Sequence, residues 1–553
     1  MSSPSNNIAV NAPTAGRALV TPRQLTLVLV VALALAWGFL PEFTVSVLSN
    51  IGLYALVAAG LVMLTGVGGM TSFGQAAFVG MGAYATAWIC TSPTAAAWLG
   101  GAVGPALLPW AVLLLALWAL HNLLDSREGR AIRALKGGRL MAESMGVDTA
   151  RHRIKLFVLA ALLAAVSGWL YAHLQRFVNP SPFNLNIGIE LLFMAVVGGA
   201  GHLWGAVLGA TLITLLKEKL QDVLPALLGT SGNFEVIVFG LLMLFVLQRF
   251  ADGLWPTLAR LTSRWVRNDA RKEIPTASKA APAQLAQRTL PATGELLLQA
   301  SDVSKRFGGL VANNAISMTL KAGEIHALIG PNGAGKSTFF NMISGVDDPT
   351  SGEVRLSGQS MTTKPSRAFA ALGLGRTFQH VRLLGQRSVV ENVALGAHLR
   401  AKRGWLAAML RLDRAEEAAL MAEARRQIER CGLGAHADTP AASLSLGQQR
   451  VVEIARALAG QPSVLLLDEP AAGLRHLEKR ALSVLLSQLR AEGLGILVVE
   501  HDMEFVMNLA DRITVLEFGT VIATGTPAEV QANPRVLEAY LGGADDELLE
   551  DAR

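Results

Sequence analysis

Eight apolar runs fill most of the first 250 residues of this 553-residue chain and restrict that half to a bundle of membrane helices. The first run lacks the small-residue cleavage site of a secretory signal, and further runs follow it, so we interpret it as a membrane span. Two later runs are short enough to predict re-entrant or tilted segments instead of full spans. The runs lie at 25–40, 45–66, 73–90, 103–121, 156–173, 187–200 (short), 203–216 (short) and 236–247.

Basic residues lie between the apolar runs and predict how the chain is oriented. Residues 1–290 carry 21 Lys+Arg against 12 Asp+Glu, whereas residues 291–553 carry 27 against 30. The segment 122–155 alone holds eight Lys/Arg, which predicts a cytoplasmic loop by the positive-inside rule. With both chain ends also cytoplasmic, the number of crossings must be even, and eight satisfies every loop. Because membrane orientation explains the basic excess, we expect no nucleic-acid partner.

Hydropathy falls near residue 251 and divides the chain into two main domains. We predict a disordered polar tail (1–23), a membrane domain (24–250), a linker (251–294), a soluble domain (295–545) and an acidic tail (546–553). The two cysteines, Cys90 and Cys431, fall in different halves, so a disulfide framework is not expected.

A glycine-rich loop in the soluble domain predicts a phosphate-binding site. The apolar strand Ile325–Ile329 leads into Gly330-Pro-Asn-Gly-Ala-Gly-Lys-Ser-Thr338, and a helix follows from Phe339. Backbone N–H groups of such a loop and the helix N-terminus surround phosphate oxygens. Lys336 is expected to reach the β- and γ-phosphates and Ser337 to ligate Mg²⁺.

A second apolar strand, Val464–Glu469, ends in two carboxylates. At the carboxyl edge of a parallel sheet, these side chains project toward the ligand crevice. Asp468 is expected to hold Mg²⁺ and Glu469 to polarise the attacking water as a general base. Strands that end in acidic residues are common, so these two residues indicate a nucleotide site only in combination with the phosphate loop.

Three more motifs make this half resemble the ATPase domain of ABC transporters. Leu444-Ser-Leu-Gly-Gln-Gln449 resembles the signature sequence LSGGQ, with Leu446 in place of the first glycine. Gln379 matches the glutamine of the Q-loop, and His501 matches the switch histidine that contacts the γ-phosphate. Phe307 stands where the family places an aromatic ring that stacks on adenine. The resemblance implies an α-helical membrane domain plus an α/β P-loop ABC ATPase domain.

The resemblance also implies a set of site residues for ATP and Mg²⁺. Glu469 and His501 are the expected catalytic residues, and Ser337, Gln379 and Asp468 are the expected Mg²⁺ ligands. Because the chain holds one signature, and the family binds ATP between two ATPase domains, at least two such domains must assemble. The expected nucleotide contacts are Phe307, Gly330, Pro331, Asn332, Gly333, Ala334, Gly335, Lys336, Ser337, Thr338 and Gln379, with Ser445, Gly447 and Gln448 of the signature.

Both halves are similar to components of the ABC importers for branched-chain amino acids. The stretches that carry this similarity are 375–379, 444–450 and 533–542 in the ATPase half and 72–84, 129–146 and 189–205 in the membrane half. The similarity implies a fused permease and ATPase, multi-pass in the cell inner membrane with its ATPase domain cytoplasmic. It would import branched-chain amino acids or related small solutes. The implied partners are a second permease, a second ABC ATPase, an extracytoplasmic solute-binding protein and membrane lipid.

Two departures from the family pattern keep another hypothesis open. After Leu124 the chain passes almost directly into the basic loop, where family permeases carry a further membrane segment and an external loop. Arg475 stands where the D-loop usually has Asn or Asp. The alternative is that a truncated permease serves as a membrane anchor, or that the chain is a regulatory ABC ATPase without its own transport activity. An exporter-type half transporter is disfavoured because the long intracellular helical extensions of exporters are missing.

Within the basic loop, Ala131–Gly146 predicts one short amphipathic helix outside the bilayer, with Ile132, Leu135, Leu140 and Met145 as its apolar positions. One interpretation is a solvated positive-inside loop. The other is a coupling helix that docks on the ATPase and transmits its motion. We favour the second because an ATPase on the same chain as its permease needs such a contact.

Overall fold

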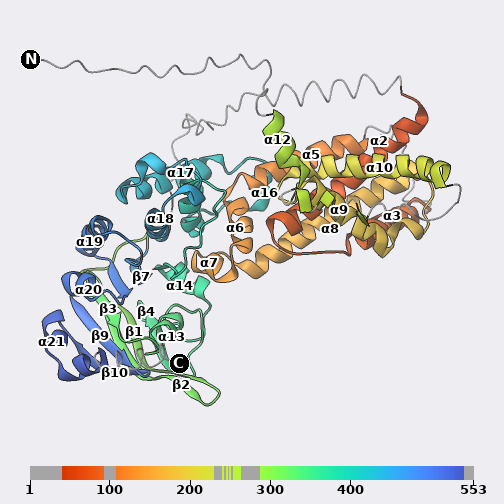
Figure 1. Cartoon of the computed structure of the whole chain (residues 1–553). Helices are drawn as coiled ribbons and strands as arrows, with labels where there is room; N and C mark the ends of the chain where they lie inside the picture. Colours follow the sequence, from red (N-terminus) through yellow and green to blue (C-terminus); the bar gives the residue numbers. More distant parts are fainter. Residues whose placement is uncertain are drawn as a thin grey trace, which may run out of the picture. The chain divides into compact units, whose positions relative to one another are not determined.

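The computed structural model describes residues 40–91, 108–228, 240–241, 245–246, 248–250, 253–262, 285 and 287–540 (Figure 1). The chain divides into a helical unit (1–66, 70–117 and 159–274) and an α/β unit (67–69, 118–158 and 275–553). The predicted polar tail, nearly all of the first span, most of the linker and the acidic tail lie outside the described residues.

The helical unit contains the apolar helices. Helix α2 continues through a short π-helix at Val62–Val67, and the boundary between the units falls inside α5 and α8. Its helices are α2 (Glu42–Leu61), α3 (Gln75–Thr91), α5 (Leu108–Leu124), α8 (Thr149–Gln175), α9 (Leu185–Gly199), α10 (Leu203–Leu228) and α12 (Leu254–Thr262), with a 3-10 turn at Ser181–Phe183.

In the described part of the chain, two helices are long and apolar enough to cross a membrane: α2 with its π-helical end, and α8. Two bent pairs raise this number to as many as four if each pair is one span. One is α5 with α6 (Arg127–Lys136), bent by 80°, and the other is α9 with α10, bent by 119°. The prediction of eight crossings therefore stays a prediction.

Helices α9 and α10 correspond to the two short apolar runs. Their sharp bend fits the expected re-entrant or tilted geometry, although α10 extends to Leu228, well beyond the predicted run. Glu190 of α9 and Lys217 of α10 form an ion pair at 3.0 Å, so these two charges neutralise each other.

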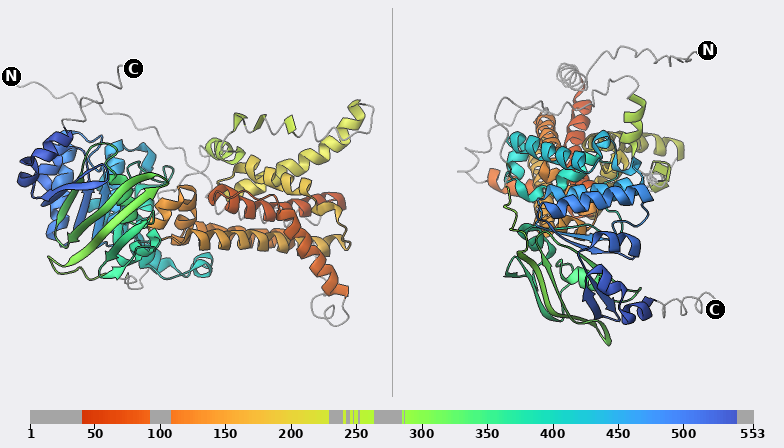
Figure 2. Two further views of the ribbon diagram at one scale, coloured as in Figure 1. Left: turned by 90° about the horizontal axis from the view of Figure 1, so that it is seen from below. Right: turned by 90° about the vertical axis from the view of Figure 1, so that its left-hand side faces the viewer.

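The α/β unit is built on two sheets (Figure 2). The first is antiparallel with the order β2-β1-β4-β5, and its long strands β1 and β2 stand out in the left view of Figure 2. The second has the order β10-β9-β3-β8-β7-β6 and is parallel except for the edge strand β10. The first sheet comprises β1 (Leu296–Phe307), β2 (Leu310–Lys321), β4 (Ser351–Leu356) and β5 (Gln359–Ser360). The second comprises β3 (Ile325–Ile329), β6 (Leu374–Arg376), β7 (Val464–Asp468), β8 (Gly495–Val499), β9 (Arg512–Glu517) and β10 (Thr520–Gly525).

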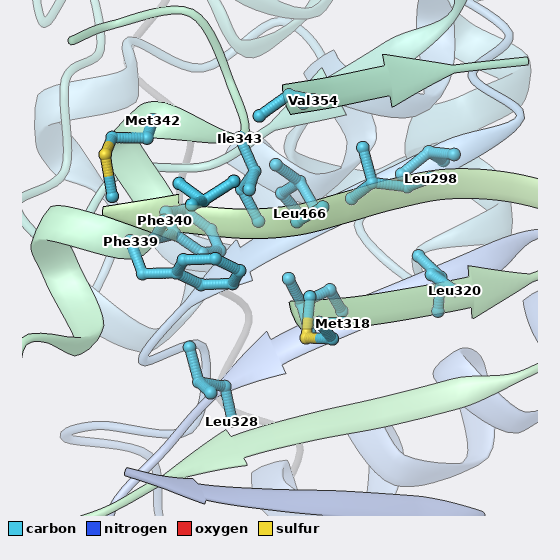
Figure 3. Close-up of a cluster of buried hydrophobic side chains, with 14 of the residues drawn as sticks. Leu298, Met318, Leu320, Leu328, Phe339, Phe340, Met342, Ile343, Val354 and Leu466 are labelled. Atoms are coloured by element: carbon cyan, nitrogen blue, oxygen red, sulfur yellow. The ribbon is translucent and has the colours of Figure 1, made fainter. Parts of the chain in front are cut away.

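The core of this unit lies between the two sheets and around α13, the helix that follows the phosphate loop (Figure 3). Phe339 and Phe340 of α13 pack with Leu298, Leu328 and Leu466 from three different strands. Strands β3, β7 and β8 are buried along their whole length, as expected for parallel strands covered on both faces. This packing fixes the phosphate loop against the sheet.

Helices complete the α/β unit. They are α6 (Arg127–Lys136), α7 (Arg139–Ser144), α13 (Lys336–Met342), α14 (Ser366–Leu372), α15 (Val389–Gly396), α16 (Trp405–Met409), α17 (Arg414–Arg430), α18 (Leu446–Ala459), α19 (His476–Ala491), α20 (Met503–Leu509) and α21 (Pro527–Gln531), with 3-10 turns at His398–Arg400, Gly434–His436 and Ala441–Ser443.

The basic loop forms two helices, so the prediction of one helix over 131–146 is wrong. Helices α6 and α7 are separated at Gly137 and Gly138, because Gly138 has a φ of 118°, which lies outside the helical region and favours glycine. Leu140, predicted as an apolar contact, is exposed, whereas Ile132 and Leu135 are buried as predicted.

Helices α6 and α7 pack directly on the soluble domain, which contradicts the interpretation as a solvated loop. Small and flexible side chains of the two helices, among them Ala134 and Met141, form one buried cluster with Met145, which directly follows α7, and with Phe378 and Leu395 of the soluble domain. These two helices are called the docked helices below.

Charged groups around the docked helices are buried and paired. Arg130 forms a two-pronged ion pair with Glu417 of α17, and both side chains are almost fully buried. Glu128 accepts a hydrogen bond from Nε2 of His152 at 2.8 Å, while Nδ1 of His152 lies 2.9 Å from the carbonyl oxygen of Asp148. Both nitrogens of the His152 ring therefore lie next to an oxygen atom that can accept a hydrogen bond.

The environment of Glu128 makes its charge a source of stability. Burial alone would raise the pKa of Glu128, but the hydrogen bond from His152 and the positive charge of Arg127 outweigh it and hold the pKa at about 2 instead of 4.5. A carboxyl group whose pKa is depressed on folding stabilises the folded state above its unfolded pKa. That contribution is lost as the pH falls from about 4.5 toward about 2.

We predict that Glu128→Gln lowers the stability at neutral pH and removes this acid-dependent component, which amounts to about 3 kcal/mol. Thermal unfolding of the detergent-solubilised chain from neutral pH down to about pH 3 measures it. Glu492→Gln, in a more exposed ion pair with Arg430, serves as the control and should keep the wild-type pH dependence. Equal pH dependence in Glu128→Gln and the wild type would contradict the prediction.

Candidate functional site

The phosphate loop connects the buried strand β3 to the N-terminus of α13. Gly335, the last residue before α13, has a φ of 91°, and a Cβ there would lie 2.5 Å from the carbonyl oxygen of Ala312, so only glycine fits. Nζ of Lys336 donates to the carbonyl oxygens of Gly330 at 2.6 Å and Pro331 at 2.8 Å. The lysine thus folds back over the start of the loop.

The remaining predicted loop residues lie in the same turn. Ala334 is buried against the strands, whereas Asn332, Gly333 and Ser337 are exposed. The Ser337 hydroxyl is therefore accessible in the first turn of α13, where the sequence places a metal ligand.

The two predicted carboxylates lie at the end of β7. The backbone N–H of Asp468 donates to the Thr377 hydroxyl at 3.2 Å, and that of Glu469 donates to the carbonyl of Val499 at 2.9 Å. Burial, with the charge of Glu469 adding to it, raises the pKa of Asp468 against the opposing charge of Arg376. Burial also lowers the pKa of Lys336, although the charges of Glu469 and Asp468 oppose the shift. These mutual effects place the lysine and both acids in one electrostatic group.

Two other predicted site residues, Gln379 and His501, lie next to the carboxylate of Glu469. Nε2 of Gln379 donates to its Oε1 at 3.2 Å, and Nδ1 of His501 lies 3.9 Å from the same oxygen. Its backbone has a φ of 47°, which is uncommon for a residue with a side chain, and Arg450 donates to its carbonyl oxygen at 2.7 Å. The structure therefore brings together the Q-loop glutamine, the general-base candidate and the switch histidine.

Phe307, the predicted adenine contact, ends β1 with half of its surface exposed. Nζ of Lys305 lies 5.1 Å from the centroid of its ring, a distance that suits a cation–π contact. The ring is thus held at the surface, where a flat base can stack on it.

The signature residues form the start of α18. Ser445 is the N-cap: its hydroxyl accepts from the backbone N–H of Gln448 at 3.3 Å, and Oε1 of Gln448 accepts from the N–H of Ser445 at 3.1 Å. Gly447 is buried, and a Cβ there would lie 2.8 Å from the side chain of Leu474. These bonds hold the signature in a defined turn at the helix start.

Arg475 occupies the N-cap position of α19. Its backbone N–H donates to Oε2 of Glu478 at 2.8 Å. A guanidinium group has no acceptor atom, so the side chain of Arg475 cannot cap the N–H groups of the first turn. Of the two hydrogen bonds of a capping box, the helix therefore has only the one from the Arg475 N–H to Glu478.

Two polar residues near the site were missed from the sequence. Glu500 is buried and accepts from the backbone N–H groups of Ala471 at 2.7 Å and His501 at 3.2 Å, so it ties the D-loop to the switch histidine. Burial raises its pKa. A glutamate at the end of an apolar strand and directly before His501 was a signal that could have identified it.

The second missed residue is Arg376, which is buried on β6. Its guanidinium donates to Oδ1 of Asn341 at 2.7 Å and to the hydroxyl of Ser344, and it lies 4.7 Å from the ring centroid of Phe340. Burial lowers the pKa of Arg376 to about 10, opposed by the charge of Asp468. A single arginine three residues before Gln379 in an otherwise buried strand was the available signal.

Comparisons with known proteins agree with these motifs. Residues 313–472 match the ABC transporter family, residues 94–247 match the permease component of branched-chain amino acid transport systems, and residues 520–546 match the branched-chain amino acid ATP-binding cassette transporter family.

Relatives of the soluble half come from bacteria and archaea. The high-affinity branched-chain amino acid transport ATP-binding protein LivG of Escherichia coli K12 is 43% identical over 251 residues, which are 45% of this chain and 98% of LivG. The corresponding protein BraF of Pseudomonas aeruginosa is 39% identical over the same shares of the two chains. A probable LivG of Archaeoglobus fulgidus is 34% identical over 46% of this chain and 98% of that protein.

We predict that Arg475→Asn stabilises the chain by about 1 kcal/mol, because the asparagine side chain supplies the missing N-cap acceptor. The free energy of unfolding from guanidinium titrations of the detergent-solubilised chain measures the effect. Arg475→Ala also removes the guanidinium but adds no acceptor, so it should leave the stability nearly unchanged. Equal stabilisation by both variants would show that loss of the arginine, and not capping, is responsible.

Proposed function

Since the chain belongs to the branched-chain amino-acid family of ABC transporters, in which it joins a permease to its ATP-binding protein, we propose that it imports branched-chain amino acids or related small solutes by hydrolysing ATP. One observation carries the proposal. The docked helices of the permease pack on Phe378, the residue before Gln379, so the membrane half and the catalytic site share a contact.

In the proposed ATPase site, the loop Gly330–Thr338 surrounds the phosphates and Lys336 neutralises their charge. Ser337, Gln379 and Asp468 would hold Mg²⁺. Among the described residues, no group of three or more His, Cys, Asp or Glu side chains could bind a metal alone. Nucleotide oxygens would therefore have to complete the coordination shell, as Mg²⁺ usually requires.

Glu469 would polarise the attacking water, and His501 would contact the γ-phosphate. The 3.2 Å contact between Gln379 and Glu469 supports a shared site for the metal ligand and the base. Because Asp468 and Glu469 are neighbours with like charges, a bound cation would relieve the repulsion that helps raise the pKa of Asp468.

The proposed nucleotide is bound between two ATPase domains. Phe307 would stack on adenine, and Ser445, Gly447 and Gln448 would close over the phosphates bound by a partner ATPase. Ser445 and Gln448 of the signature form hydrogen bonds with each other, and Gln448 also contacts His436. The exposed side of this turn is therefore available to a partner domain.

When the two ATPase domains close on ATP, Gln379 would move toward the nucleotide. Phe378 would transmit this motion to the docked helices. The buried pair Arg130–Glu417 strengthens this connection, because a buried ion pair is costly to break at one end only.

The chain would be a multi-pass protein of the cell inner membrane with its ATPase domain in the cytoplasm. Its partners would be a second permease, a second ABC ATPase and an extracytoplasmic solute-binding protein. The competing hypothesis, a membrane anchor or regulatory ATPase without its own transport, rests on the direct passage from α5 into the basic loop after Leu124. Uptake of radiolabelled leucine by a deletion strain separates the two, because unchanged uptake would exclude the importer.

We predict that Glu469→Gln binds ATP but hydrolyses it about 100-fold more slowly or worse, since loss of a general base costs this much. Lys336→Ala should instead lose tight nucleotide binding. Binding of a fluorescent ATP analogue and phosphate release, measured on the purified chain, separate the two effects. Glu538→Gln, an exposed acid outside the site, is the control. Normal turnover in Glu469→Gln would exclude this residue as the base.

We also predict that Glu417→Ala uncouples ATP hydrolysis from transport, because Arg130 is left buried without its partner. The ratio of solute taken up to ATP hydrolysed in proteoliposomes should fall, while nucleotide binding is unchanged. Asp438→Ala breaks the pair that Asp438 forms with Arg425 of the same helix α17, where the carboxylate is 75% exposed, and should have no effect. An unchanged ratio in Glu417→Ala would contradict the proposed coupling route.

A further inference from the structure

A short segment of the soluble domain exposes an unusual number of leucines. Residues 401–414, called the interfacial segment below, run from the 3-10 turn at His398–Arg400 to the first residue of α17 and contain α16. Leu406, Leu410 and Leu412 expose 77%, 54% and 61% of their surface, although they lie within seven consecutive residues. Three large exposed aliphatic side chains so close together indicate an interaction surface.

The first anchor of this segment is the end of α5, an apolar helix and one half of a candidate membrane span. Nδ2 of Asn122 donates to the carbonyl oxygen of Met409 at 2.9 Å, and its Oδ1 accepts from Nε of Arg411 at 2.6 Å. Asn122 lies two residues before the end of α5 at Leu124. The exposed leucines are therefore attached to the point where the apolar helix ends.

The second anchor is the start of α8, which in the described part of the chain is one of two single helices long and apolar enough to cross a membrane. The buried ring of Trp405 lies 6.0 Å from the ring of His152, and Nζ of Lys155 lies 5.7 Å from the Trp405 centroid. The segment is thus held at the ends of two apolar helices at once, beside α6 (Figure 1).

Basic residues accompany the leucines. The segment contains Lys402, Arg403, Arg411 and Arg414 and one acid, Asp413, and Arg414 lies 3.8 Å from the carboxylate of Asp125. Lys402 and Arg403 are exposed. Leucines flanked by Lys and Arg are the composition of protein segments that lie at a membrane interface, where the apolar groups enter the acyl region and the cations contact lipid phosphates.

We propose that the interfacial segment inserts Leu406, Leu410 and Leu412 into the cytoplasmic leaflet of the bilayer. Lipid is the proposed binding partner of this surface, because the segment is fixed to the ends of two apolar helices and exposes Lys402 and Arg403. The ATPase domain would then contact lipid directly, in addition to its contact with the docked helices. This inference depends on the membrane location of α5 and α8 and not on the transported solute.

The test places an environment-sensitive fluorophore on Leu406→Cys in the full chain, with Cys90 and Cys431 replaced by serine, and reconstitutes it in lipid nanodiscs. Leu477→Cys, on α19, is the matched control, because Leu477 has the same 77% exposure as Leu406. Lipids with a nitroxide on the acyl chain should quench the probe at 406 several-fold more than at 477. Adding phosphatidylglycerol to phosphatidylcholine should increase this difference.

Equal quenching by nitroxide lipids at the two positions would overturn the proposal. So would a probe at 406 that is shielded from aqueous iodide but not quenched by the nitroxide lipids, since a protein partner or a second copy would then cover the leucines. Because the readout is fluorescence and not uptake, it remains decisive even if the chain fails to transport leucine.

Discussion

The packing of the docked helices around Phe378 is the contact on which the rest of the functional arrangement depends. Phe378 lies in a buried cluster with Ala134, Met141 and Met145, and the next residue, Gln379, contacts Glu469. A displacement of the cluster is therefore passed on toward Glu469, because close-packed interiors transmit strain instead of absorbing it.

The same interface is rich in buried charge, which gives it specificity more than strength. The pair Arg130–Glu417 crosses this interface and is nearly inaccessible to water, and burying it costs solvation that its attraction only partly returns. An apolar surface would tolerate sliding, whereas paired charges are satisfied in one alignment. The docked helices are thus held in a single register on the ATPase.

The sequence predicts the catalytic half better than the interfaces. Strands such as β3 and β7 follow from short apolar runs, and the loop between Gly330 and Thr338 from its glycine spacing, because these are local properties. The break at Gly138 and the burial of Arg376 depend on contacts with residues far along the chain, and no local pattern contains them. Leu140 was assigned to the buried face for the same reason: helical periodicity was extended across a break.

The distance along the chain between Arg130 and Glu417 has a consequence for synthesis. The two residues are 287 positions apart, so at about 5–20 residues per second the ribosome needs roughly 15–60 s to supply the second after the first. Phe378 and Leu395, which cover the apolar side of the docked helices, are synthesised within that interval and before Glu417. The charge of Arg130 is therefore among the last groups of this interface to gain its partner, and it stays unpaired until α17 has been synthesised.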